Sequence, residues 1–160
     1  IMFKISRLTP FALFLLLLLP QISQAHCQVP CGIYDDAARV VRLFEDAATI
    51  EKAMLQMKNL AGKTDAQSAN QLTRWIMTKE THASNIITTV SEYFLTQKVK
   101  PVAADAEGHD LYLSKLADHH RVMVAAMKTK QNSDTGFVAE LRAALDALGE
   151  HYDMKHFKEH

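Results

Sequence analysis

From residue 35 onwards, apolar residues recur at spacings of three and four, and no stretch sustains an alternation of apolar and polar residues. This period is typical of α-helices that bury one face. Glycine occurs 5 times and proline 4 times in 160 residues, so helix breakers are few, and we predict an all-α chain. The four predicted inward faces are Val40, Phe44, Ala47, Ala48, Met54 and Leu55; Leu72, Trp75, Ile76, Lys79, Ala83, Ile86, Ile87, Val90 and Phe94; Leu113, Leu116, Ala117, His120, Val124 and Met127; and Phe137, Leu141, Ala144, Leu145, Leu148 and Tyr152.

Capping residues bound the first two helices. The first is expected to begin near Asp35 or Asp36, because acids suit both an N-cap and the positive end of the helix dipole. Gly62 is expected to end it. The run Thr64 to Gln67 has the form of a capping box, in which a threonine hydroxyl and a glutamine amide satisfy the amides at a helix start.

Short connections link the remaining helices. Pro101 separates the second helix from the third, which is expected to end near Gln131–Asn132, and Ser133–Thr135 offers caps for the fourth. Such connections favour antiparallel neighbours, so residues 35–152 are predicted to form an up-down-up-down four-helix bundle. Residues 153–160 form a polar C-terminal tail.

The N-terminal 25 residues have the pattern of a secretory signal. Lys4 and Arg7 precede the unbroken apolar run Phe11–Leu19, and small residues occupy the cleavage positions in Ser23–Ala25. The apolar run is too short for a transmembrane helix, so removal by a signal peptidase or an equivalent protease is favoured over a retained anchor. We therefore expect an exported protein, periplasmic or extracellular, with no membrane segment after processing.

The charge balance argues against nucleic acid as a partner. The whole chain has 18 Lys and Arg residues and 18 Asp and Glu residues. Cleavage after Ala25 would remove two basic residues and no acidic one, leaving a small negative charge. A nucleic-acid-binding domain would instead show a basic surplus.

The helical histidines do not form a recognisable metal motif. No pair of Glu-x-x-His motifs occurs, and the adjacent His119 and His120 would point about a hundred degrees apart on a helix. We therefore expect one at the edge of the core and the other in solvent. His82 flanks an apolar face, where a structural role is favoured, although it could support a metal site. His156 and His160 are best explained as part of a solvated tail.

Both cysteines lie immediately after the predicted cleavage point, at Cys27 and Cys31. Cleavage after Ala25 would leave His26 with a free amine beside its imidazole. The amine, the Cys27 amide nitrogen and the Cys27 thiolate could form fused chelate rings, with Cys31 completing a planar set and the imidazole approaching axially. Such a set favours Ni(II) or Cu(II) and suits zinc poorly. Anionic amide and thiolate donors also stabilise a higher oxidation state, which makes one-electron chemistry on a small molecule accessible.

Two other interpretations of the cysteines remain open at this point. In an exported protein, Cys27 and Cys31 could form a disulfide that pins the N-terminus of a non-enzymatic bundle. The same donors could also serve a protein that carries or scavenges copper or nickel.

The run His-Cys-x-x-Pro-Cys-Gly-x-Tyr-Asp at residues 26–35 resembles the nickel hook of nickel-dependent superoxide dismutases. Residues 72–94 also resemble the second helix of that family. The resemblance implies a bundle of four helices preceded by an irregular hook at residues 26–34, with one nickel ion per subunit. It further implies assembly as a homohexamer and conversion of superoxide to O2 and H2O2 through a Ni(II)/Ni(III) cycle.

The resemblance also implies roles for individual residues. His26 would provide its amine and imidazole, Cys27 its amide and thiolate, and Cys31 the second thiolate. Tyr34 would lie over the open face of the metal and order superoxide and water. The candidates for contacts around these ligands are Gln28, Pro30, Gly32 and His82.

Two positions depart from the family pattern. Gln28 replaces a residue that is often acidic, and His82 stands where some members have an arginine after the Lys-Glu pair of the second helix. Both changes affect the expected hydrogen bonding of the axial imidazole and leave the metal ligands themselves in place.

Overall fold

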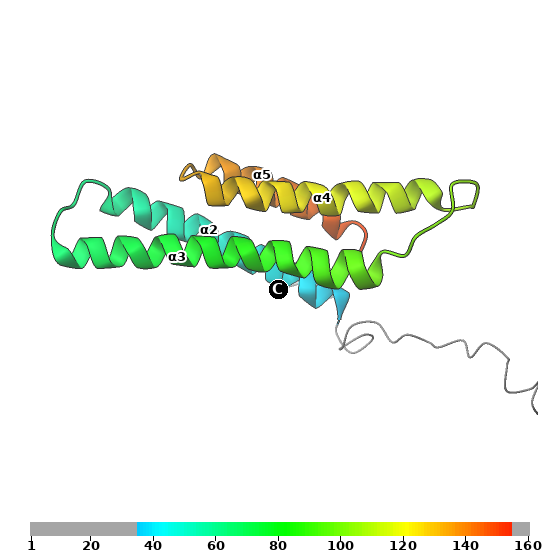
Figure 1. Cartoon of the computed structure of the whole chain (residues 1–160), viewed down its shortest axis with the longest axis horizontal. Coiled ribbons are helices and arrows are strands. Elements are labelled where there is room, and N and C mark those ends of the chain that lie inside the picture. The colour runs from blue at the N-terminus through cyan, green and yellow to red at the C-terminus, as the bar shows by residue number, and fades with distance from the viewer. Residues whose placement is uncertain (1–34, 155–160) are drawn as a thin grey trace, which may run out of the picture.

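A computed structural model describes residues 35–154, which form an antiparallel four-helix bundle (Figure 1). Helix α2 spans Asp36–Leu60 and α3 spans Ala66–Thr88, continued by the π-helical segment η1, Thr89–Lys98. Helices α4, His109–Gln131, and α5, Gly136–Gly149, follow. Helix α2 packs against α3 and α5, and α4 packs against the same two helices. The predicted all-α, up-down-up-down bundle is confirmed.

The start of α2 agrees with the sequence-based expectation. Asp35 is the N-cap, and its side chain accepts a hydrogen bond from the backbone nitrogen of Ala38 at 3.1 Å. Asp36 lies in the first turn, where its negative charge interacts favourably with the positive end of the helix dipole. After Leu60 the chain turns through Gly62, whose φ of +81° is readily adopted only by glycine.

The predicted capping box at Thr64 to Gln67 is wrong. The N-cap of α3 is Asp65, whose carboxylate accepts from the Ser68 backbone at 2.9 Å and from the Ser68 hydroxyl at 2.6 Å. These hydrogen bonds hold the pKa of Asp65 below its ordinary value. A carboxylate that accepts two bonds satisfies the helix start without the Thr64 hydroxyl, so the helix begins one residue later than a Thr64 cap requires.

The second long helix widens at its C-terminal end, which the sequence did not predict. In η1, two side chains donate to backbone carbonyl oxygens five residues earlier. The Thr96 hydroxyl donates to Ser91 at 2.7 Å, and the side-chain amide of Gln97 donates to Glu92 at 3.1 Å. The Val99 nitrogen also bonds the carbonyl of Phe94, at 2.9 Å. π-helical turns are rare, and they occur frequently at functional sites.

The predicted inward face of α4 is wrong. Leu113 and Met127 are 47% and 42% exposed, and His120 is exposed as well. The buried face is shifted around the helix and consists of His119, Val122, Ala125, Ala126 and Thr129. Large apolar residues occur on more than one side of this helix, and its close packing against α3 and α5 favours the side with small alanines.

The other three faces were predicted more accurately. On α2, Val40, Ala47 and Met54 are buried, whereas Ala48 and Leu55 are exposed. On α3 and η1, the residues that were predicted to face inward and are buried are Lys79, Ala83, Ile86, Val90 and Phe94. On α5 they are Leu141, Ala144, Leu145 and Leu148, and Val138 is buried in place of the partly exposed Phe137.

Lys79 shows why a charged residue can occupy a core position. Its side chain is buried, and its ammonium donates to the carbonyl oxygens of Thr129 and Lys130 at 2.8 and 2.5 Å and to Glu80 at 2.9 Å. The first two contacts satisfy carbonyl groups near the C-terminus of α4, where the helix itself offers no donor. Within residues 35–154, no helix combines the length and apolar character needed to cross a membrane.

Candidate functional site

The predicted metal ligands His26, Cys27 and Cys31 lie outside the described residues. Tyr34, Gln28, Pro30 and Gly32 lie outside them too, as does the leader, so these assignments stay predictions. The structure does define where this segment joins the bundle, because Asp35 is the first described residue and caps α2.

A polar cluster surrounds this junction. The Tyr93 hydroxyl donates to Asp36 at 2.5 Å, and the ammonium of Lys98 lies 3.0 Å from the same carboxylate oxygen. The Lys98 ammonium and the Arg39 guanidinium also lie 5.8 and 5.7 Å from the centre of the Tyr93 ring. Burial, then the hydrogen bond to Asp36, raises the pKa of Tyr93, so its phenol keeps its proton. Sequence reasoning missed this cluster, since Asp36 and Tyr93 are 57 residues apart.

Aromatic rings continue from this cluster into the bundle. The ring of Phe94 lies 5.0 Å from Tyr93, 4.8 Å from Tyr152 and 5.5 Å from His119, measured between centroids. Phe94 is fully buried. These contacts join η1 to α4 and to the residues that follow α5.

His119 is a buried histidine with both ring nitrogens engaged. Nδ1 lies 2.7 Å from the carbonyl oxygen of Lys115, and Nε2 lies 2.7 Å from the hydroxyl of Tyr152. A carbonyl can only accept, so we assign the proton to Nδ1 and the acceptor role to Nε2. Burial lowers the pKa of His119, which favours this neutral form. One core and one solvated histidine were expected in this pair, and the core residue is His119 instead of His120.

Beside it, His151 stacks on the His119 ring at 6.4 Å with an interplanar angle of 16°. Its Nε2 lies 2.8 Å from a carboxylate oxygen of Asp118, which also pairs with Arg121 at 2.5 Å. These contacts attach the residues after α5 to the middle of α4.

His82 has a structural contact within the bundle. Its Nδ1 lies 2.5 Å from the carboxylate of Asp46, which connects α3 to α2. Asp46 is ten residues beyond Asp36, about 15 Å along the helix at 1.5 Å per residue. The expected structural role is therefore supported, and any contact of His82 with the hook stays a prediction.

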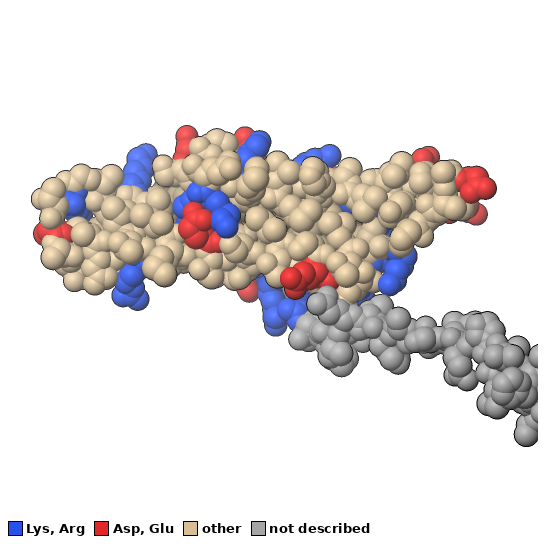
Figure 2. Space-filling model, in the orientation of Figure 1, with Lys and Arg blue, Asp and Glu red and all other residues tan. Residues whose placement is uncertain are grey.

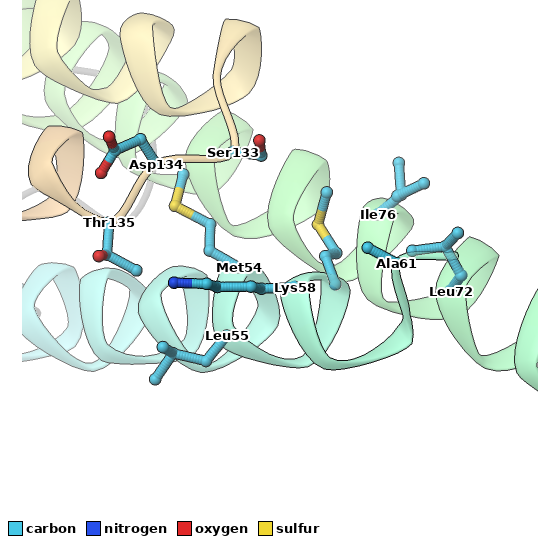
Figure 3. Close-up of a pocket in the computed structure, with 10 residues that line it drawn as sticks. Met54, Leu55, Lys58, Ala61, Leu72, Ile76, Ser133, Asp134 and Thr135 are labelled. Carbon is cyan, nitrogen blue, oxygen red and sulfur yellow. The ribbon is translucent and has the colours of Figure 1, made fainter. Parts of the chain in front are cut away.

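A pocket with a mostly apolar lining lies at the opposite end of the bundle. It has a volume of about 620 Å³ and lies between the end of α2, the start of α3 and the α4–α5 connection (Figure 3). Lys58 and Asp134 are its only charged residues. Met54, which lines it, is about 27 Å along α2 from Asp36, so this pocket is separate from the junction with the hook.

The described residues do not supply a metal site of their own. Within residues 35–154, no group of three or more His, Cys, Asp or Glu side chains is arranged to hold a metal ion. Acidic and basic side chains are interspersed on the face shown in Figure 2. In the N-terminal sequence, the thiols of Cys27 and Cys31 and the imidazole of His26 are donor types that suit nickel.

The fold and these donors define a helical-bundle protein with a candidate metal-binding N-terminus. The family model for nickel-containing superoxide dismutase matches residues 21–156, and the chain belongs to this family. It is accordingly an oxidoreductase that acts on superoxide and uses nickel as its cofactor. No curated protein and no solved structure matches the chain.

Proposed function

We propose that dismutation takes place at a processed N-terminus, with residues 26–34 as the nickel hook. In the overall reaction, two superoxide anions and two protons become O2 and H2O2. The observation that carries this proposal is the single continuous family match, which includes the hook motif as well as the helices.

The proposed ligands are the amine and imidazole of His26, the amide nitrogen and thiolate of Cys27 and the thiolate of Cys31. This donor set fits nickel because thiolates and nitrogen donors stabilise both of the oxidation states that the reaction requires. When bound, nickel would supply one-electron redox chemistry between Ni(II) and Ni(III). Cleavage after Ala25 is essential to this assignment, since only then does His26 have an amine.

The remaining roles belong to side chains around the ligands. Tyr34 orders superoxide and water through its phenol. The Asp36–Tyr93–Lys98 contacts hold the first turn of α2, two residues beyond Tyr34, and thereby give the hook a rigid attachment. His82 supports the His26 imidazole through Nε2, since its Nδ1 is occupied by Asp46.

We further propose that the processed chain is exported and assembles as a homohexamer. The described surface has several large exposed apolar side chains, namely Leu55, Ile76, Met77, Leu111, Leu113 and Met127. Covering such residues in subunit contacts is favourable. Subunit contacts would also shield hook thiolates from oxidation by the peroxide that the enzyme produces.

Intact mass combined with metal analysis tests the proposed site. We expect a chain that begins His26-Cys27 and contains one nickel ion. A mass lower by two hydrogens with no metal would indicate a Cys27–Cys31 disulfide, and copper in place of nickel would indicate a copper-binding role. Either result would contradict the assignment of the hook.

A further inference from the structure

The Tyr152–His119 pair is a partly buried phenol directly bonded to a neutral, fully buried base. Tyr152 donates to Nε2 of His119 at 2.7 Å, and His119 is 0% exposed. Since Nδ1 is bonded to the Lys115 carbonyl, Nε2 presents its lone pair to the phenol. The proposed dismutation mechanism does not use either residue.

We propose that Tyr152 is a redox-active tyrosine, which gives one electron to a one-electron oxidant while its phenolic proton passes to Nε2 of His119. The O–H bond of the phenol breaks and an N–H bond forms on the imidazole. The electron reduces the oxidant, leaving a neutral tyrosyl radical and an imidazolium. An electron returned to the radical, with the proton returned to its oxygen, restores the pair.

The surroundings of Tyr152 make a base necessary. Burial raises the pKa of Tyr152, so the phenol is protonated before it reacts. Loss of an electron alone would leave a cationic ring, partly removed from water, against the fully buried apolar ring of Phe94, and an unpaired charge in such a place is costly. Proton transfer over a single hydrogen bond removes that charge from the ring. On His119, burial and the charges of His151 and Lys115 oppose the protonated form, while the hydrogen bond to the Lys115 carbonyl and the charge of Asp118 favour it.

The other described tyrosines are less suited to this chemistry. Tyr93 is bonded to the carboxylate of Asp36, a weaker base than imidazole, and two cations lie near its ring and oppose the loss of an electron. Within residues 35–154, Tyr112 makes no hydrogen bond to a base, and its ring lies 6.0 Å from that of His109. Tyr152 alone combines an imidazole acceptor with a ring that has no cation over it in the described part of the chain.

A use for this residue follows from the enzyme's chemistry. Phe94 contacts the rings of both Tyr93 and Tyr152, at 5.0 and 4.8 Å, and thereby connects Tyr152 with the end of the bundle at which α2 begins. Oxidising radicals derived from peroxide at that end could be reduced by Tyr152 before they damage the core. This use rests on the proposed function, whereas the redox property of the Tyr152–His119 pair does not.

Flash photolysis with ruthenium(III) tris-bipyridine as the oxidant tests the pair directly. The probe is applied to the purified protein after alkylation of Cys27 and Cys31, so that neither sulfur nor nickel competes. Electron paramagnetic resonance on frozen samples should show a tyrosyl radical. Tyr152→Phe should remove most of this signal, and the matched control Tyr112→Phe should retain it. A signal that persists in Tyr152→Phe would overturn the proposal.

The role of His119 requires its own readout. His119→Gln, which removes the base, should lower the radical yield, whereas His120→Gln on the exposed side of the same helix should leave it unchanged. In the unaltered protein, high-field resonance should show the g-value shift of a radical that accepts a hydrogen bond from a protonated imidazole. This measurement stands even if a variant fails to fold, and an unshifted g value would contradict the proposal. Nickel content and dismutation are not measured, so failure here is distinct from failure of the proposed function.

Discussion

Asp36 is the residue on which contacts converge at the start of the bundle. It accepts the Tyr93 hydroxyl and pairs with Lys98, so the first turn of α2 is fastened to η1. In the sequence, Tyr34 precedes Asp36 by two residues. The residues proposed to bind nickel and those that hold the first turn of α2 therefore act through different contacts, and substitutions should separate them.

Replacement of either cysteine should abolish nickel binding without unfolding the bundle. In Cys27→Ser and Cys31→Ser, a hydroxyl replaces a thiolate and is a poor nickel ligand. We expect nickel content and dismutase activity to be lost together, with unchanged helical circular dichroism, because the described core contains neither cysteine. Loss of helicity in either variant would indicate that the cysteines are structural.

Removal of the Tyr34 hydroxyl should affect turnover and not metal content. In Tyr34→Phe, the ring is kept, while the group proposed to order superoxide and water is lost. Metal analysis should still find one nickel ion per chain, and stopped-flow kinetics should show altered saturation by superoxide. If nickel is lost along with activity, the phenol has a role in holding the metal that we do not assign to it.

At the scale of elements, α3 depends on the carboxylate that caps it. Asp65→Ala removes the acceptor of both Ser68 bonds, so the start of α3 loses its side-chain cap and the bundle is destabilised. Urea titration followed by circular dichroism should show this decrease in the free energy of unfolding. Thr64→Ala is the matched control and should be nearly neutral. A larger destabilisation by Thr64→Ala than by Asp65→Ala would show that Thr64 is the cap.

At the scale of the whole molecule, buried His119 makes stability depend on pH. Its pKa is lowered in the folded protein from an ordinary value of 6.5, so the unfolded chain binds the proton more readily. The stabilisation is complete above about pH 6.5 and is lost as the pH falls below that value, by about 1.4 kcal/mol for each unit of difference in pKa. Urea titrations at several pH values should show a smaller acid loss in His119→Gln, with His120→Gln resembling the unaltered protein. If the free energy of unfolding decreased equally on acidification in both variants, groups other than His119 would cause the pH dependence.

The assembled enzyme should be a hexamer if the hook relies on neighbouring subunits for protection. Sedimentation equilibrium of the processed, nickel-loaded protein should give six times the mass of one processed chain. A monomer with full activity and long-lived nickel would show that the hook is shielded in another way.

The sequence by itself determined the features that depend on neighbouring residues. The hook motif at residues 26–35, the four helices and the Asp35 cap are local patterns, in which residue type and spacing suffice. The Asp65 cap was misassigned to Thr64 because two adjacent residues can both cap a helix. The choice depends on which side chain reaches the Ser68 amide, and a sequence pattern does not specify that geometry.

Only the tertiary structure decided which side of α4 is buried and which polar groups meet. The spacing of apolar residues placed His120 on the inward face, whereas the packing of α4 against α3 and α5 buries His119. The pairs Asp36–Tyr93 and His119–Tyr152 join residues 57 and 33 positions apart. Their contacts exist because antiparallel packing brings the start of α2 beside η1, and the residues after α5 beside the middle of α4. The physical reason is that burial and long-range hydrogen bonding depend on what lies opposite a residue, which its neighbours in the chain do not specify.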